Sequence, residues 1–475
     1  MTGYRLPDGT VPVLVSAVTA ELLRTEAAAL RCYAGAHPDV DPQAIAGMLF
    51  RTRIARPHRA LAMVTGRAEL LDALAAITAG DDHPAVVRTR TPAVARRIAF
   101  VCPGQGGQRP GMARVCYDAV PAFRAEADRC AEAFRDASGA TPLGYLLDRH
   151  PGAETASTVQ PALFTEMAAL AAMWRSFGVT PEATVGHSQG EIAAAYLSGV
   201  IPLTDAVQVI GIRAGAADEF ASGQYAMAVA ATDRDTCESL LARCSGFAEL
   251  SVVNSPGMIG VSGDRATVQA IVDTLTERGV FARVIGVHYP AHTSAINTLR
   301  GRFSTAASCQ PFQDTGIPCV GTTLGAAITA DLAVDEYWFL NLRNTVRFDR
   351  AISAAVALGI DTFIELAEHP TLQLAIAEND PAALVVGTSE RAATDLAVFT
   401  RNLAVLAVND LNYRWECLHT EPAGPAPLPL ADFPNTVMNE VPLWLPYDPG
   451  ARGPEAAPRS APAQLLTEQW VRLSR

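Results

Sequence analysis

The chain has 475 residues, of which 49% are hydrophobic and 18% are charged, and its net charge is −12. This composition excludes a disordered protein, because the apolar content is sufficient for a large core. It also argues against a nucleic-acid-binding protein, which needs an excess of cations. At roughly 150 residues per domain, the length predicts two to four compact units.

Targeting segments and metal motifs are not evident in the sequence. No apolar run reaches the ~20 residues of a membrane helix, and the N-terminus lacks the apolar stretch of a signal peptide. The nine cysteines include no C-x-x-C pair, which favours reduced thiols over disulfides or a zinc site. We therefore expect a cytoplasmic protein with no membrane contact and no metal. The sequence contains no lysine, which excludes Walker A and Schiff-base chemistry.

Residues 11–80 have the pattern of a small α/β unit. Val13-Leu14-Val15 is a short apolar strand, and Thr19 can cap a helix that runs to about Tyr33. Two further helices are expected over residues 39–54 and 68–77, on either side of a strand over residues 60–64. A break rich in glycine, aspartate and proline follows at residues 80–84.

A second α/β unit begins with a strand over residues 98–101, and Pro103-Gly104-Gln105-Gly106-Gly107-Gln108 follows directly. Pro161 is expected in the first turn of a long helix, where the missing N–H of proline costs nothing. The buried face of that helix is predicted to carry Leu163, Met167, Leu170 and Trp174. Alternating strands and helices predict a parallel sheet covered by helices.

Residues 226–288 have a different order of elements, βαββαβ, which is typical of a ferredoxin-like module. This module is predicted to be inserted into the larger unit, because α/β patterning resumes after it with strands near 362–366 and 384–387. The proline-rich segment 421–462 favours an extended strap on the surface, with Trp444 and Tyr447 as anchors.

One motif indicates a nucleophile. Gly186-His187-Ser188-Gln189-Gly190 matches G-x-S-x-G between a predicted strand and a predicted helix. A serine on such a sharp turn takes strained backbone angles, and Cβ atoms at the two glycine positions of the motif would clash. The turn also places the serine at a helix N-terminus, where backbone N–H groups favour an oxyanion. The alternative is an ordinary tight turn.

A nucleophilic serine needs a base. His187 adjoins Ser188, so its side chain should point elsewhere. His292 lies just beyond the ferredoxin-like module, in a loop that Pro290 makes rigid, at a domain junction where a base could lie over a cleft. From spacing alone, His292 is a candidate base, and a hydrogen-bonded structural histidine is the alternative.

Five motifs in this order resemble a known family: Pro103-Gly104-Gln105-Gly106, Gln160-Pro161-Ala162-Leu163-Phe164, Gly186-His187-Ser188-Gln189-Gly190-Glu191, Tyr289-Pro290-Ala291-His292, and Tyr337-Trp338 followed by Asn341-Leu342-Arg343. The chain resembles the acyltransferase domain of modular polyketide synthases, akin to malonyl-CoA:acyl-carrier-protein transacylases. Within that family it is similar to the synthases of mycobactin-type siderophores.

The resemblance implies an α/β fold: an α/β-hydrolase-like parallel-sheet domain with an inserted ferredoxin-like subdomain, preceded by a small α/β linker domain. The implied boundaries are 1–95 for the linker domain, 96–225 with 289–395 for the large subdomain, 226–288 for the small subdomain, 396–450 for a wrapping linker and 451–475 for a flexible tail. The tail resembles the opening of a reductase-type domain. We therefore expect a piece of a larger synthase whose condensing enzyme is on another polypeptide.

The resemblance also implies a role for each site residue. Ser188 would be the nucleophile and His292 its base, oriented by the backbone carbonyl of Asn341. The backbone N–H groups of Gln105 and Gln189 would form the oxyanion hole. Arg213 would bind the free carboxylate of the substrate, a task that suits its two-pronged guanidinium. The implied specificity pocket comprises His187, Tyr289, Pro290 and Ala291.

The implied reaction has two half-steps. Ser188 takes the acyl group from a CoA thioester, and the phosphopantetheine thiol of an acyl carrier protein then accepts it. No metal or bound cofactor is implied. The implied partners are the acyl-CoA, the acyl carrier protein, and the condensing (ketosynthase) and reductase domains of the same assembly line.

Two other classes of function stay open. A serine thioesterase or hydrolase would use the same turn, but it has no use for Arg213 at the acyl pocket. A noncatalytic docking scaffold would not need Ser188. For the extender unit, the family resemblance favours methylmalonyl-CoA over malonyl-CoA. Tyr289 and Gln189 are the residues that methylmalonyl members carry at these positions, and the small Ala291 leaves room for a methyl branch, whereas Pro290 fits neither the malonyl nor the methylmalonyl pattern. One methyl group discriminates by only about 1–3 kcal/mol.

Overall fold

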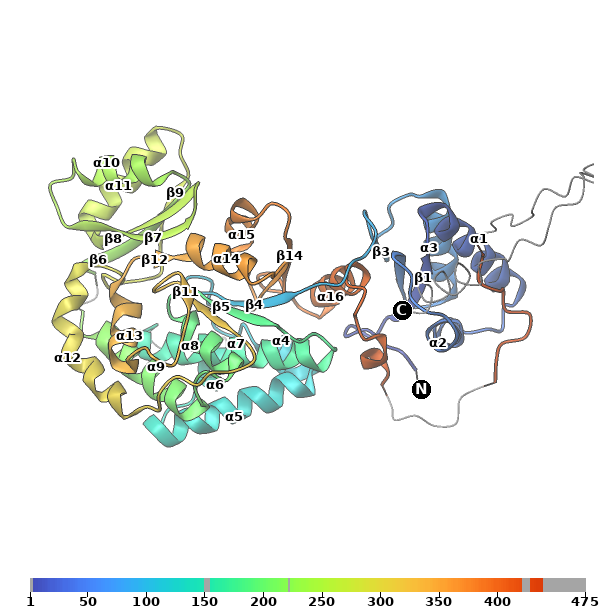
Figure 1. Cartoon of the computed structure of the whole chain (residues 1–475), viewed down its shortest axis with the longest axis horizontal. Coiled ribbons are helices and arrows are strands. Elements are labelled where there is room, and N and C mark those ends of the chain that lie inside the picture. Colours follow the sequence, from blue (N-terminus) through green and yellow to red (C-terminus); the bar gives the residue numbers. More distant parts are fainter. Residues whose placement is uncertain (1–2, 149–153, 221–222, 421–427, 439–475) are drawn as a thin grey trace, which may run out of the picture. The chain divides into compact units, whose positions relative to one another are not determined.

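A computed structural model describes residues 3–148, 154–220, 223–420 and 428–438, which lie almost entirely in one compact unit, Met1–Thr436. Three sheets organise this unit (Figure 1). The α/β architecture predicted from the sequence is confirmed. Among the described residues, no helix is long and apolar enough to span a membrane, and no cluster of three His, Cys, Asp or Glu side chains could hold a metal ion.

The N-terminal domain packs three helices against a three-stranded antiparallel sheet of order β1-β2-β3. Thr19 caps the first helix as expected, by accepting a hydrogen bond from Leu22 N. The third strand was not predicted, because its three residues are too few for a pattern. The elements are β1 Val11–Ala17, α1 Ala20–Ala36, α2 Pro42–Thr52, β2 His58–Val64, α3 Arg67–Ala79 and β3 Val86–Arg88.

A six-stranded sheet of order β11-β10-β5-β4-β13-β14 forms the centre of the large subdomain. All of its strand pairs are parallel except β10 with β11. Its central strands are fully buried, as the continuous apolar sequence of β4 requires. The strands are β4 Ile98–Cys102, β5 Ala183–Gly186, β10 Cys319–Gly321, β11 Ala326–Ala327, β13 Thr362–Glu365 and β14 Leu384–Gly387.

Helices surround this sheet (Figure 1). They are α4 Arg114–Ala119, α5 Pro121–Ser138, α6 Leu143–Leu147, α7 Ala156–Ser176, α8 Gly190–Ser198, α9 Leu203–Asp218, α12 Arg300–Phe303, α13 Val334–Arg343, α14 Phe348–Ala357, α15 Gln373–Asn379 and α16 Ala397–Asn409. Short 3-10 helices are η1 Ser294–Leu299, η2 Ser304–Ser308 and η3 Trp415–Leu418.

The predicted start of the long helix α7 is wrong. Pro161 lies inside α7, which begins five residues earlier, at Ala156. Asp218, on α9, explains the difference, because its carboxylate accepts hydrogen bonds from the backbone N–H groups of Ala156 (2.7 Å) and Ser157 (3.0 Å). A cap supplied by another helix leaves no signal in the local sequence.

The small subdomain is ferredoxin-like, as expected, with strands in the order β9-β6-β8-β7. A fifth strand, β12 Val346–Arg347, extends this sheet by pairing in parallel with β7, although it lies outside residues 226–288. The remaining elements are β6 Tyr225–Ala230, α10 Arg234–Leu241, β7 Ala248–Ser255, β8 Met258–Asp264, α11 Arg265–Glu277 and β9 Ala282–Ile285.

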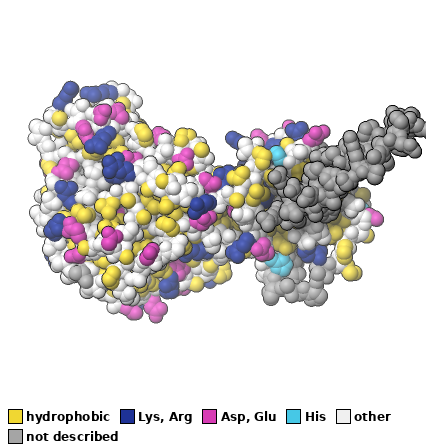
Figure 2. Space-filling view, viewed as in Figure 1, with side chains coloured by type: hydrophobic (Ala, Val, Ile, Leu, Met, Phe, Trp, Pro, Cys, Tyr) yellow, Lys and Arg dark blue, Asp and Glu magenta, His cyan; other side chains and the backbone are white. Residues whose placement is uncertain are grey.

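The described part of the proline-rich segment lies on the N-terminal domain. Leu430 and Phe433 pack against the core of that domain, and Arg53 Nη2 donates a hydrogen bond to the Pro434 carbonyl (2.5 Å). Trp444, Tyr447 and the tail 451–475 lie outside the described residues. Figure 2 shows arginines and carboxylates interspersed on the visible face, so the net negative charge is not gathered into one patch there.

Candidate active site

Ser188 lies at the turn between β5 and α8, as the G-x-S-x-G motif predicts. Its backbone φ is 55°, in the left-handed region that residues with a Cβ rarely adopt. The two glycines of the motif permit close packing around it. A Cβ on Gly186 would lie 2.2 Å from Glu191 Cα, and one on Gly190 would lie 2.1 Å from the Cys102 carbonyl oxygen. Only glycine fits at either position.

The helix behind Ser188 is held at both ends. Glu191, buried at the start of α8, accepts hydrogen bonds from Thr323 N (2.8 Å), the Tyr337 hydroxyl (2.6 Å) and the Thr322 hydroxyl. Thr322 Oγ1 in turn accepts the backbone N–H of Ser188 (3.2 Å). Burial raises the pKa of Glu191, while these hydrogen bonds stabilise its charged form.

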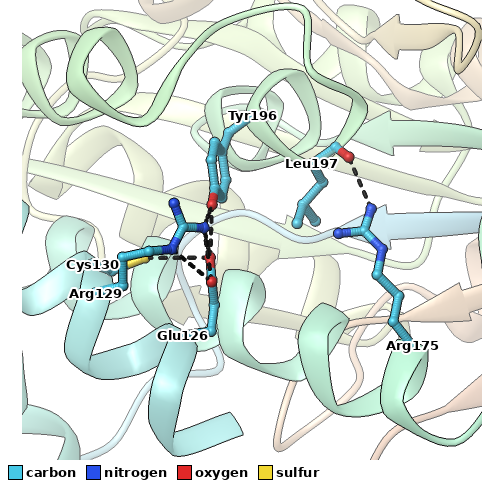
Figure 3. Close-up of polar contacts among 6 residues, drawn as sticks. All are labelled: Glu126, Arg129, Cys130, Arg175, Tyr196 and Leu197. Atoms are coloured by element: carbon cyan, nitrogen blue, oxygen red, sulfur yellow. Dashed lines mark hydrogen bonds and ion pairs between the residues drawn. The ribbon is translucent and has the colours of Figure 1, made fainter. Parts of the chain in front are cut away.

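Figure 3 shows the far end of α8. The Tyr196 hydroxyl donates to Glu126 on α5 (2.7 Å), and Arg129 donates to the same carboxylate (2.6 Å). Arg175 Nη2, from α7, donates to the Leu197 carbonyl (2.9 Å). A cation at this position stabilises the C-terminal end of α8, which carries partial negative charge. The helix that begins beside the nucleophile is therefore fixed to its two neighbours.

His292 lies next to Ser188. Its Nε2 is 2.7 Å from Ser188 Oγ, and both side chains are buried. Its Nδ1 is 2.9 Å from the Asn344 carbonyl oxygen, so Nδ1 carries the proton and Nε2 is the acceptor. Burial, followed by the positive charge of Arg213, lowers the pKa of His292 to about 3. The imidazole is therefore neutral at pH 7 and can accept the Ser188 proton.

The prediction that the Asn341 carbonyl orients the base is wrong. The carbonyl that holds His292 belongs to Asn344, three residues beyond Asn341 and just past the end of α13. Asn341 acts through its side chain instead, because Nδ2 donates to the Ser188 carbonyl (2.9 Å) and Oδ1 accepts from Arg213 Nε (3.2 Å). A backbone carbonyl is set by chain geometry and not by residue type, so no sequence signal marks Asn344.

Arg213 lies beside the nucleophile on α9 and is 1% exposed. Its Nη2 donates to Ser188 Oγ (3.0 Å). Its Nη1 has no hydrogen-bond partner among the described residues although it is buried. Burying a guanidinium that has an unsatisfied N–H group costs free energy unless an anion pairs with it. The arrangement therefore suits a ligand carboxylate.

Two backbone N–H groups near the site in sequence have no acceptor in the part of the chain that the structure describes. They belong to Gln105, in the loop after β4, and to Gln189, at the start of α8. The Gln105 side chain is fixed by Tyr289, whose hydroxyl donates to its Oε1 (3.3 Å), and by the Gly286 carbonyl (3.4 Å). Free N–H donors beside a nucleophile can stabilise an oxyanion.

The other predicted pocket residues lie around this centre. The Tyr289 hydroxyl also accepts from Gln160 Nε2 (3.3 Å), and Pro290 and Ala291 are buried. His187 points away from Ser188, because its Nε2 contacts Asn254 Oδ1 (2.9 Å) and its Nδ1 lies against Gly104. Burial lowers the pKa of His187 to about 4, so it is neutral too.

Comparisons with known proteins show the family of the chain. Residues 99–412 match the family model of the acyl transferase domain. The chain belongs to the acyltransferase domains of polyketide synthases. This acyltransferase is 34% identical over 454 residues to the spectinabilin polyketide synthase system protein NorA' of Streptomyces orinoci, covering 94% of the chain and 12% of NorA'. It is 33% identical over 445 residues to the pikromycin polyketide synthase component PikAIII of Streptomyces venezuelae, covering 92% of the chain and 27% of PikAIII.

A solved structure extends the similarity to the fold. The acyltransferase domain from module 8 of the salinomycin polyketide synthase has a TM-score of 0.80 and 31% identity, covering 88% of this chain and 99% of that one. This acyltransferase therefore spans a small part of the long polyketide synthase proteins NorA' and PikAIII, but it covers nearly all of the solved salinomycin acyltransferase domain.

Proposed function

We propose that this acyltransferase loads a malonyl-type extender unit from CoA onto Ser188 and then onto the phosphopantetheine thiol of an acyl carrier protein. One observation carries the proposal. The Ser188–His292 hydrogen bond is buried beside Arg213, whose Nη1 has no partner among the described residues. A nucleophile, a neutral base and an unpaired cation in one site suit a thioester that carries a free carboxylate.

In the first half-reaction, Ser188 Oγ attacks the thioester carbonyl carbon while its proton passes to His292 Nε2. The negative charge that develops on the carbonyl oxygen is stabilised by the N–H groups of Gln105 and Gln189. When the tetrahedral intermediate collapses, the C–S bond breaks. The leaving CoA sulfur takes the proton from His292, which leaves an ester on Ser188 and free CoA.

The second half-reaction reverses these steps with another thiol. The phosphopantetheine sulfur gives its proton to His292 and attacks the Ser188 ester. Collapse returns the proton to Ser188 Oγ and releases the acyl carrier thioester. The Asn344 carbonyl keeps His292 in one tautomer throughout, because it accepts from Nδ1.

Methylmalonyl-CoA is the favoured extender unit, with malonyl-CoA as the second candidate. Ala291, one residue before the base, is 2% exposed, and its small side chain would crowd a methyl branch on the α-carbon of the substrate less than a large side chain would. A phenylalanine at this position would crowd that branch. The preference is modest, because a methyl group contributes only about 1–3 kcal/mol.

Mass spectrometry of Ser188 tests both parts of this proposal. The protein is mixed with equal concentrations of malonyl-CoA and methylmalonyl-CoA, and the mass added to Ser188 is read before and after a carrier protein is supplied. We expect methylmalonyl to predominate and to move to the carrier. Ala291→Phe should then block methylmalonyl loading and leave malonyl loading largely intact. Predominant malonyl loading of the unmodified protein contradicts the extender assignment, and labelling that survives Ser188→Ala contradicts the mechanism.

The remaining partners and boundaries follow from the same family resemblance. We propose ketosynthase and reductase domains as neighbours in the assembly line, a mycobactin-type siderophore synthase as the parent, and the cytoplasm as its location. The proposed domain boundaries are those given above, with β12 added to the small subdomain. Limited proteolysis followed by mass spectrometry checks them, because cleavage is expected near residues 95 and 395.

A further inference from the structure

The loop that carries Gln105, residues 103–108, contributes to the lining of a cavity of about 10 Å³. We call this segment the Gln105 loop. A second segment, residues 367–371, which follows β13, lines the same cavity. Its walls include Pro103, Gly104 and Gly107 from the loop, and Glu166, Glu368 and His369 from the opposite side.

One ion pair joins the loop to this segment. Arg109, directly after the loop, donates from Nε to Glu368 Oε2 (2.9 Å) and from Nη2 to Glu368 Oε1. Such a two-pronged pair fixes direction as well as distance. The loop also rests on the segment at Gly107, where a Cβ would lie 3.2 Å from the His369 carbonyl oxygen.

Buried carboxyl groups fix the segment in turn. Glu166, on α7, accepts the backbone N–H of Glu368 (3.1 Å). Glu365 accepts the N–H groups of Thr371 (2.7 Å) and Leu372 (2.9 Å). Glu166, Glu365 and Glu368 are 3%, 0% and 7% exposed. The segment beneath the Gln105 loop is therefore held by buried acids, and Arg109 pairs with one of them, Glu368.

The charge on Glu166 depends on pH. The charged groups that act on it are Glu368 and Arg109, and its own charge acts on Cys116 of α4 and Tyr145 of α6. Burial, followed by the negative charge of Glu368, raises the pKa of Glu166 to about 8. Glu166 is therefore neutral at pH 7. Above pH 8 it becomes a second anion beside Glu368.

We propose that Arg109 and Glu368 are positioning residues that hold the Gln105 loop at the height where its N–H reaches the oxyanion, and that ionisation of Glu166 disturbs this pair. A charged Glu166 competes for Arg109 and repels Glu368, which displaces the segment beneath the loop. The inference rests on the proposed role of Gln105 in the transacylation.

Glu368→Gln tests the ion pair. The first-order rate of Ser188 acylation is measured by quenched-flow mass spectrometry, with Glu336→Gln as the matched control, because Glu336 forms a two-pronged pair with Arg300 on the exposed surface. Losing an oxyanion donor outright costs about 100- to 1,000-fold, so partial displacement should lower the maximal rate roughly 10-fold with KM nearly unchanged. The control should acylate as the unmodified protein does. A normal maximal rate in Glu368→Gln overturns the proposal.

Glu166→Gln tests the control by pH and keeps the proposal testable if Glu368→Gln fails to fold. The unmodified protein should lose acylation rate above about pH 8, and Glu166→Gln, which cannot ionise, should keep its rate to pH 9. The same alkaline loss in both proteins overturns the role of Glu166. Failure of the proposed function is distinguishable, because the unmodified protein would then acquire no acyl group on Ser188 at any pH.

Discussion

Both residues of the proposed catalytic pair have positive φ without being glycine. Ser188 has φ 55° and His292 has φ 61°. Their backbone N–H groups are held by Thr322 Oγ1 (3.2 Å) and the Leu342 carbonyl (2.9 Å). Strained conformations persist only where the surroundings fix them. Both reacting groups are therefore held in place before substrate arrives.

Arg213→Ala is expected to lower kcat/KM for a diacid CoA thioester. The substrate carboxylate would lose its partner in a buried site, which costs about 2–5 kcal/mol, or roughly 30- to 4,000-fold in rate. Selectivity against acetyl and propionyl thioesters should relax. Steady-state kinetics with both substrate classes check this, with the exposed Arg300→Ala as control. Unchanged kinetics with the diacid would contradict the role of Arg213.

The pH profile should reveal the depressed pKa of His292. An ordinary imidazole is protonated below about pH 6.5 and can no longer act as a base. Burial lowers the pKa of His292 to about 3, so the neutral form persists as pH falls. We expect kcat/KM for Ser188 acylation to stay nearly constant from pH 7 to pH 5. A loss of half the rate near pH 6.5 would refute this reading of the site.

At the scale of elements, the β5–α8 turn depends on the absence of a side chain at Gly190. A Cβ there would lie 2.1 Å from the Cys102 carbonyl oxygen and 2.4 Å from that of Pro103, and neither backbone atom can move without shifting β4. Gly190→Ala should destabilise the fold by about 1–3 kcal/mol and abolish acylation of Ser188.

Gly215→Ala is the matched control for this substitution. Gly215 lies in the exposed face of α9, and a Cβ there meets nothing within 4 Å. Alanine should therefore stabilise the protein by roughly 0.5–1 kcal/mol through its higher helix propensity. Urea unfolding measures both variants. Equal stability of the two would show that the turn tolerates a Cβ.

Much of this architecture was predictable because its signals are local. The apolar run of β4, the Thr19 cap and the βαββαβ order all lie within short windows. The errors arose where distant residues decide the outcome. Asp218 starts α7 from another helix, and the Asn344 carbonyl reaches His292 from 52 residues away. For the site, G-x-S-x-G and the family resemblance located residues, but not the contacts of Glu191 or Glu368.

At the scale of the whole molecule, Arg59 joins the N-terminal domain to the end of the acyltransferase. It is fully buried in β2, and its Nη1 donates to the carbonyls of Ala407 (3.1 Å) and Asp410 (2.5 Å) at the C-terminus of α16. A cation there satisfies carbonyls that have no partner within the helix. One side chain thus fastens two segments about 350 residues apart in sequence.

Arg59→Ala should lower the free energy of unfolding by about 3 kcal/mol, because buried carbonyls left unsatisfied cost about 1–3 kcal/mol each. Chemical denaturation measures the change. Arg56→Ala is the control, since Arg56 is exposed and such surface substitutions usually stay within about 0.5 kcal/mol. If both variants unfold alike, Arg59 does not hold the domains together.

The two residues of the proposed catalytic pair follow strands of two different sheets. Ser188 follows β5 of the six-stranded sheet, whereas His292 follows β9, and Asn344 lies just before β12, both in the five-stranded sheet. The 2.7 Å hydrogen bond between Ser188 and His292 therefore joins segments that follow the two sheets, and it depends on how those sheets are placed relative to each other. A long thioester substrate that contacts both sheets would use part of its binding energy to align His292 with Ser188. Thioester substrates that are shortened at the end far from the reacting carbon should then have a lower kcat, even at saturating concentration.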